Sequence, residues 1–456
     1  MPAVSASARK YDEAELRNLA DDVIARVRKA GADAADLLVV SGSSLSASCR
    51  MGEVEDIERS EGQDLGLRAF IGKRQAIVSS SDLNGATLDQ LIERVVVMAR
   101  LAPEDAYCGL APDEVLAREY PELNIHDATE PDMPALIDAA RQTEKTARAV
   151  EGVTNSEGAS AGCSHSRIVL AASNGFSGSY ASSSFSLSCS VLAGEGTAMQ
   201  RDYEYSSARH YADLSPPEEI GQVAAQRAVS RLNPRKIKTQ QAPVIYAPRV
   251  SNGLLGHLAG AISGAAVARG ASFLKDRMGK AVFASGITVI DDPHRKRGLR
   301  SKPFDGEGAA TRPSLIIEDG VLKTWFLDSA SARQLGLQST GHASRGPGST
   351  PSPAPTNLYM RAGVISAVDM IASVKRGLFI TELIGMGVNP LTGDYSRGAA
   401  GFWIENGAFA YPVSEITVAG NLLDMFMHMT PADDLSFRYG MDAPSLMIEG
   451  MTIAGE

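Results

Sequence analysis

Apolar residues near the start of the chain recur every three or four positions, the spacing that gathers side chains on one face of a helix. They are Leu16, Leu19, Val23, Ile24 and Val27. Asp12, with Glu15 three residues later, is typical of a capping box at a helix start, and Gly31 ends the pattern. The pattern therefore predicts a first helix between Asp12 and Gly31.

The rest of the N-terminal half mixes strand and helix patterns. Short apolar runs predict strands over residues 36–41, 44–49, 65–71 and 75–80, the last two forming a hairpin. Runs at helical spacing predict helices over residues 87–101, 135–149 and 217–232. The Pro- and acid-rich residues 102–134 predict a loop. In residues 154–190 apolar and hydroxyl side chains alternate, which favours strands with one polar face; that face could also line a polar cavity.

A polar segment before the strand at residues 244–247 marks the predicted domain boundary. We expect an N-terminal α+β domain over residues 1–238, with a further division near 103–134, and a C-terminal domain over residues 239–456. Strand patterns dominate the second domain, apart from a Gly/Ala-rich helix within 251–268 and a short helix over 329–335. The predicted fold class is α+β, with a β-rich C-terminal domain built around one central Gly/Ala-rich helix.

Two segments of the C-terminal domain carry further expectations. Residues 341–355 are rich in Gly, Pro and Ser, which predicts a flexible surface loop. The Gly/Ala-rich helix is uncharged, but a membrane span needs about 20 predominantly apolar residues, so no membrane association is expected. Gly256, Gly260 and Gly264 each cost about 0.5–1 kcal/mol relative to Ala inside a helix, so their spacing predicts a close neighbour or a cavity wall.

His257 stands where a helical zinc motif would begin. A hydrolytic zinc site needs about three protein ligands, an open position for water, and usually a carboxylate that takes the water's proton. Here Leu258 follows the histidine, and residues 258–262 contain no His, Cys, Asp or Glu. A single imidazole on an apolar helix is more often a hydrogen-bonded core residue than a ligand. Other histidines could still converge on it from elsewhere in the chain: His165, His210, His342 and His428.

Four longer motifs make the chain similar to a known family. GLLGHLAGAISG begins at Gly253, FDGEGAATRPSLIIEDGVL at Phe304, TNLYMRAG at Thr356, and ELIGMGVNPLTGDYSRGAAGFWIENGAFAYPV at Glu382. In order and spacing these motifs resemble the TldD/PmbA family over almost the whole chain, and specifically its PmbA branch, also called TldE.

The resemblance implies a site that has lost its metal chemistry. In the TldD branch, His-Glu-x-x-x-His and a later Cys supply the zinc ligands and the general base. At the corresponding positions this chain has His257, Leu258, Ile262 and Gly398, so only the first ligand is retained. The resemblance therefore implies no catalytic residue and no metal in this chain, with zinc held by a TldD-type partner.

The family also implies a function carried out by two chains. A TldD-type zinc peptidase subunit and a PmbA-type chain enclose a cavity and cleave unfolded peptides, in maturation of a peptide antibiotic precursor and in antitoxin degradation. An older label, modulator of DNA gyrase, describes a phenotype. We expect this chain to be the non-zinc subunit, which binds extended peptide by strand addition to a sheet edge. A homodimeric peptide-binding or regulatory protein without hydrolysis is the alternative if no zinc-bearing partner exists.

The charge and the N-terminal sequence indicate which classes of partner and which cellular compartment to expect. The formal charge of −10, from 44 basic and 54 acidic residues, disfavours nucleic acid as a partner. The start of the chain, MPAVSASARKYDEAEL, lacks the apolar core of a secretory signal, which predicts a cytoplasmic location. In that compartment four cysteines are expected to remain buried thiols, namely Cys49, Cys108, Cys163 and Cys189.

Two other patterns in the sequence are candidate sites. Residues 158–162 match G-x-S-x-G around Ser160, but that motif requires a helix directly after the serine, and strand-like residues follow. A self-standing hydrolase is therefore a minor alternative. Acidic residues at 291–292 and at Asp305 and Glu307 flank a basic run at 295–302, and could hold a cation or an acidic partner. Charged runs between strands are usually solvated, which is the state predicted here. The resemblance marks Asp305-Gly306-Glu307 as a motif of the fold without a known role.

Overall fold

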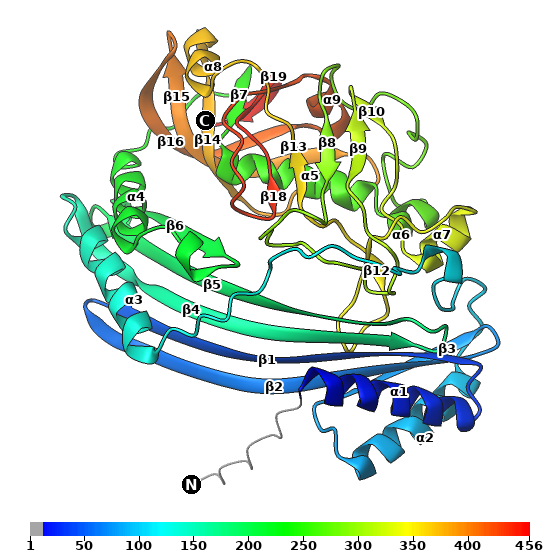
Figure 1. Cartoon of the computed structure of the whole chain (residues 1–456). Coiled ribbons are helices and arrows are strands. Elements are labelled where there is room, and N and C mark those ends of the chain that lie inside the picture. Colours follow the sequence, from blue (N-terminus) through cyan, green and yellow to red (C-terminus); the bar gives the residue numbers. More distant parts are fainter. Residues whose placement is uncertain (1–11) are drawn as a thin grey trace.

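The computed structural model describes residues 12–456 and contains a long antiparallel sheet below a second half made of shorter strands (Figure 1). The sheet has the strand order β3-β2-β1-β4-β5-β6. Its strands are β1 (Ala34–Arg50), β2 (Glu53–Ile71), β3 (Arg74–Ser80), β4 (Val153–Ala172), β5 (Ser177–Ala193) and β6 (Gln200–Ala208). Four helices accompany them: α1 (Glu13–Lys29), α2 (Gly85–Leu101), α3 (Met133–Arg148) and α4 (Pro217–Ser230).

Alternation along β1 assigns the two faces of this sheet. Leu37 and Val39 are fully buried in a core formed with α1 and α2, whereas Leu38 belongs to a separate cluster that includes Phe304 from the second half. Successive residues of a strand point to opposite faces. The sheet is therefore covered by α1 and α2 on one face and by the C-terminal half on the other, as Figure 1 shows.

Most elements of the N-terminal half agree with the sequence prediction, and β1 differs in one respect. Asp12 and Glu15 form the predicted capping box of α1, and β2 and β3 form the predicted hairpin. The two short strands predicted over 36–41 and 44–49 are one strand. Gly42 does not interrupt it, because Gly42 pairs with Gly62 of β2 on one side and with Ser166 of β4 on the other.

The C-terminal half is built on a ring of strands. β7 pairs with β14 and β19, and the sheet closes because β16 pairs with both β15 and β19. The strands of this sheet are β7 (Gln240–Tyr246), β14 (Arg376–Ile384), β15 (Asp394–Glu405), β16 (Ala408–Asn421), β17 (Met429–Pro431) and β19 (Leu446–Ala454). The helices of this half are α5 (Pro248–Ala261), α6 (Gly264–Ala268), α7 (Ser329–Leu335), α8 (Ala367–Ser373) and α9 (Leu422–Met427).

Two smaller sheets complete the second half. One has the order β10-β9-β8-β13-β18, and the other is a two-stranded ribbon, β11 with β12. Their strands are β8 (Val289–Asp291), β9 (Ser314–Glu318), β10 (Val321–Leu322), β11 (Ala343–Ser344), β12 (Ser352–Pro353), β13 (Leu358–Met360) and β18 (Met441–Asp442). Short 3-10 turns lie at Asp113–Val115, Gly196–Ala198 and Tyr211–Asp213. The predicted α+β class with a β-rich C-terminal half is confirmed.

The central Gly/Ala-rich helix is divided, where the sequence predicted one helix. α5 ends with Ile262 as its C-cap, and α6 begins at Gly264. Between them the backbone pairs with another segment, since Phe326 donates from its N–H to the carbonyl of Ile262, and Gly264 donates to the carbonyl of Phe326. These hydrogen bonds replace the helical ones at this point.

The prediction of an ordinary surface loop over residues 341–355 holds for residues 348–350, which are exposed, and is wrong for residues 341–345. The side chain of Arg345 is fully buried and donates to Asp36 of β1 at 2.7 Å. Asp36 also pairs with Arg68 of β2. Burial raises the pKa of Asp36, but the two guanidinium groups outweigh it and hold that pKa below its ordinary value. The loop is thus fixed to the long sheet by a buried ion-pair network.

The hydrophobic cores separate near the predicted boundary. The largest cluster contains no residue before Ile237, and two other clusters lie wholly within the first half. The boundary at residues 238/239 and the division near 103–134 remain predictions. Among residues 12–456 no helix is long and apolar enough to cross a membrane.

Candidate functional site

His257 is held by α5 on the border of the largest core. Pro248 starts this helix, where its missing N–H costs no hydrogen bond. Leu254, Leu255 and Leu258 of the same helix are buried and anchor it. The imidazole packs edge-on against Tyr395 of β15, with ring centroids 5.9 Å apart. His257 thus lies against β15, the strand that also carries the Gly398 position of the motif.

The imidazole of His257 is electrically neutral at neutral pH. Burial lowers its pKa below the ordinary 6.5, and the nearby guanidinium of Arg397 lowers that pKa further. Its Nε2 atom is buried and has no hydrogen-bond partner among the described residues. The expectation of a hydrogen-bonded core histidine is therefore not met at this nitrogen.

The three other positions of the degenerate motif supply no donor atom for a metal. Leu258 and Ile262 are both fully buried in the apolar core. Gly398 lies on β15 opposite Ile384 of β14, and a Cβ built on it would lie 3.3 Å from the Cβ of Ile384. Two of these positions are filled by packing, and the third has little room for a side chain.

These residues do not fit a zinc ion. Zinc in proteins takes three or four nitrogen, sulfur or oxygen ligands, whereas here one imidazole faces a fixed positive charge on Arg397. In the chain from residue 12 onward, no group of three or more His, Cys, Asp or Glu side chains could hold a metal ion. Sequence reasoning missed Arg397, although it directly precedes the Gly398 position.

The other histidines lie in separate environments and do not converge on His257. His165 of β4 packs near His126 and Phe185. His210 contacts the carbonyl of Asn124, His342 lies 3.3 Å from Asp291, and His428 contacts the carbonyl of Asp424.

Ser160 has no nucleophile geometry. It lies in the middle of β4, paired with Ser48 on one side and with Ser188 on the other. The strand runs on to Ala172 without the sharp turn that exposes a nucleophilic serine. The four cysteines are all buried and free, as predicted. Burial raises the pKa of Cys189 to about 12, which keeps its thiol unreactive.

Three of the acidic residues that flank the basic run are buried, which contradicts the prediction of solvated charges for Asp291, Asp305 and Glu307. Asp292 is half-buried, and Lys296, Arg297 and Arg300 of the run are exposed as predicted. Asp305 accepts hydrogen bonds from the backbone N–H groups of Glu307, Ala309 and Ala343. Glu307 accepts from the N–H of Ser329 at 2.8 Å. Burial, with help from the neighbouring Asp305 charge, raises the pKa of Glu307 to about 7. Asp305 thus fixes the turn and the ribbon that leads to Arg345, so this motif organises the loop.

Comparisons with known proteins show similar domains along most of the chain. Models of PmbA/TldA metallopeptidase domains match residues 35–99 (domain 1), 126–232 (central domain) and 239–455 (C-terminal domain). The chain is 40% identical to the metalloprotease PmbA of Escherichia coli O157:H7, over 93% of both chains. It is 38% identical to a metalloprotease PmbA homolog of Haemophilus influenzae, over 98% of this chain and 97% of that one. A metalloprotease TldD homolog of the same H. influenzae strain is 24% identical over 86% of both chains.

Solved structures share the whole fold. A Bacteroides thetaiotaomicron protein named as a candidate modulator of DNA gyrase superposes with a TM-score of 0.90 at 28% identity, covering 98% of this chain and 100% of that one. TldE from Thermococcus kodakarensis superposes with a TM-score of 0.87 at 22% identity, covering 96% of this chain and 100% of that one; this second likeness concerns the fold alone.

Proposed function

The chain belongs to the PmbA/TldD metallopeptidase family, and from this membership we propose that it is the subunit without zinc in a two-chain peptidase that cleaves unfolded peptides. The observation that carries the proposal is the surrounding of His257. Its motif partners are replaced by Leu258, Ile262 and Gly398, and the charged group beside it is the cation of Arg397. Such a site cannot activate water through a metal, so hydrolysis belongs to a partner.

The occurrence of both branches in one organism supports a paired function. A PmbA homolog and a TldD homolog occur in the same strain of H. influenzae, and the chain resembles both over most of their length. We propose that the partner of this chain is a TldD-type subunit, that zinc is bound there, and that the complex is cytoplasmic.

Strand addition, the proposed mode of peptide binding, has only some sheet edges available. On the β6 edge of the long sheet, arginine side chains already donate to the carbonyls of Arg201, Tyr203 and Tyr205. On the opposite side, β3 covers only residues 65–71 of β2. The open edge of the long sheet is therefore the stretch of β2 before residue 65, where an extended peptide could add backbone hydrogen bonds.

Native purification tests the proposal. The tagged chain is purified from its own host at low salt, the co-eluting proteins are identified, and the intact mass of the assembly is measured. We expect a stoichiometric companion that carries an intact His-Glu-x-x-x-His motif. A homodimer that binds peptides without hydrolysing them, with no companion, would contradict the proposal and favour an independent binding protein.

A further inference from the structure

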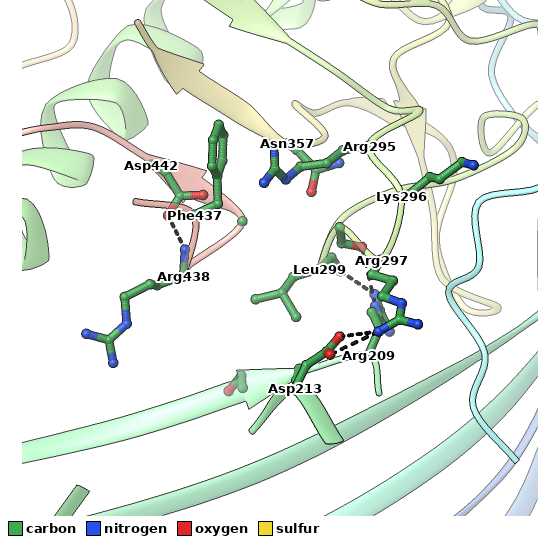
Figure 2. A pocket seen from close by; sticks show the side chains of 14 residues that line it. Arg209, Asp213, Arg295, Lys296, Arg297, Leu299, Asn357, Phe437, Arg438 and Asp442 are labelled. Atoms are coloured by element: carbon green, nitrogen blue, oxygen red, sulfur yellow. Dashed lines mark hydrogen bonds and ion pairs between the residues drawn. The ribbon is translucent and has the colours of Figure 1, made fainter. Parts of the chain in front are cut away.

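A basic cavity lies between the end of β6 and two loops of the C-terminal half (Figure 2). Its volume is about 210 Å³. Its ionisable lining residues are five cations and two acids: Arg209, Arg295, Lys296, Arg297, Arg438, Asp213 and Asp442. A local excess of three positive charges is unexpected in a chain whose formal charge is −10.

Three of these cations have structural partners. Arg297 donates to both carboxylate oxygens of Asp213 at 2.9 Å. Arg209 donates to backbone carbonyls, including that of Ser183 at 2.9 Å. The guanidinium of Arg438 contacts Glu204 at 3.2 Å, and Figure 2 shows it pointing away from the other cations.

Arg295 remains to contact a ligand. Neither Arg295 nor Lys296 has a side-chain hydrogen bond or an ion pair within residues 12–456, but Lys296 is exposed and Figure 2 shows its side chain directed away from Arg295. The guanidinium of Arg295 lies over the ring of Phe437, which is 40% exposed. Asp442 Oδ1 accepts from the backbone N–H groups of Arg438 and Tyr439 at 2.9 and 2.8 Å. No hydrogen bond joins this carboxylate to Arg295, although the Arg295 charge opposes the rise that burial causes in the pKa of Asp442.

Size and chemistry together limit the ligand. A cavity of about 210 Å³ admits one side chain or a chain end, and is below the usual range of roughly 300–1,000 Å³ for pockets that take a cofactor. A guanidinium fork matches a carboxylate in a planar, bidentate arrangement. The adjacent exposed Phe437 ring gives the apolar part of the same residue a surface to pack on.

We propose that this cavity binds a carboxylate of the peptide substrate, with Arg295 as the cation that contacts it and the exposed Lys296 adding positive charge at the rim. The inference rests on the proposed peptide-binding function and adds a preference for acidic segments. The carboxylate can come from an acidic side chain or from the C-terminus of the peptide, since the two have the same chemistry.

Calorimetric titration with three matched hexapeptides distinguishes these sources. The first peptide has one Glu and blocked ends, the second has Gln and a free C-terminal carboxylate, and the third has Gln and blocked ends. We expect at least one of the first two to bind about tenfold more tightly than the neutral peptide, as for one charge-assisted contact of about 1.4 kcal/mol. The double variant Arg295→Gln/Lys296→Gln should remove this preference, whereas Lys375→Gln, at an exposed position outside the cavity, should retain it.

Further measurements distinguish failure of the carboxylate site from failure of the proposed peptide binding. Lys296→Glu should disfavour the acidic peptide while the neutral peptide still binds. Equal affinity of all three peptides, a preference that survives the double variant, or tighter binding of inorganic phosphate than of any peptide would overturn the carboxylate site and leave the proposed peptide binding intact. If none of the peptides bound, even in the assembled complex, both proposals would fail.

Discussion

At the scale of single residues, the surroundings of His257 do not fit a zinc ion, because Leu258 and Ile262 are apolar and the charged group nearby is the cation of Arg397. The loss of ligands could be predicted from the sequence, because Leu258 and Ile262 stand at positions that the motif identifies. The position of Arg397 could not be predicted, because it depends on how β15 packs against α5. The burial of Asp305 and Glu307 was missed for the same reason, since a charged run in sequence does not show which side chains tertiary contacts enclose.

Glu307 makes a pH-dependent prediction. Its pKa rises from 4.5 to about 7 on folding, so the folded protein binds more protons than the unfolded chain between these values. The free energy of unfolding contributed by this group therefore falls as pH rises through that window. Glu307→Gln can still accept a hydrogen bond from the N–H of Ser329. Its free energy of unfolding, relative to that of the parent, should therefore rise by on the order of 2 kcal/mol from pH 5 to pH 8.

Urea unfolding at the two pH values measures this difference. Glu114→Gln, at an exposed position, is the matched control. A Glu307→Gln variant whose stability difference from the parent is the same at pH 5 and pH 8 would show that Glu307 does not titrate in this window.

At the scale of elements, the spacing of hydrophobic residues predicts that a helix or a strand is present. It does not predict whether that element is continuous or interrupted. The capping box of α1 and the short helix α7 lie where they were predicted, because local signals define them. β1 is continuous and the Gly/Ala-rich helix is broken because distant segments supply the hydrogen bonds, from β2 and β4 in one case and from Phe326 in the other. Such partners are not visible in a local pattern.

The docked loop makes a prediction at Gly66 of β2. A Cβ at this position would lie 1.9 Å from the carbonyl oxygen of Pro347. Gly66→Ala should therefore displace the loop and destabilise the protein by about 1–3 kcal/mol. Limited proteolysis should show new cleavage within residues 345–351. Gly62→Ala is the control on the same strand, since nothing lies within 4 Å of its Cβ. Equal stability and equal protease resistance of the two variants would contradict the docking.

The glycines of the broken helix make a second prediction. A Cβ on Gly264 would lie 2.5 Å from Leu327 Cδ2, whereas nothing lies within 4 Å of one on Gly260. The predicted close packing therefore applies to Gly264 and not to Gly260. Thermal unfolding should show Gly264→Ala destabilised by about 1–3 kcal/mol and Gly260→Ala stabilised by about 0.5–1 kcal/mol. A gain in stability from both substitutions would contradict the close approach of residues 326–331 to Gly264.

At the scale of the whole molecule, buried and half-buried charges join the two halves. Arg345 reaches Asp36, Arg249 reaches Asp202, and Arg231 bridges Asp202 and Glu382. The class of fold and its β-rich second half could be predicted from strand and helix patterns alone. This junction and the basic cavity could not, because their residues lie far apart in the sequence.

The most direct test of the central claim is a peptidase assay on the complex, with zinc measured in each chain. The purified chain alone should neither cleave an unfolded peptide nor hold stoichiometric zinc. When it is mixed with a zinc-bearing TldD-type chain from its host, cleavage should appear and EDTA should abolish it. His257→Ala in this chain should leave that rate within about twofold, since a residue outside the chemistry contributes little to transition-state stabilisation. Cleavage by the isolated chain that is lost on His257→Ala would contradict the account.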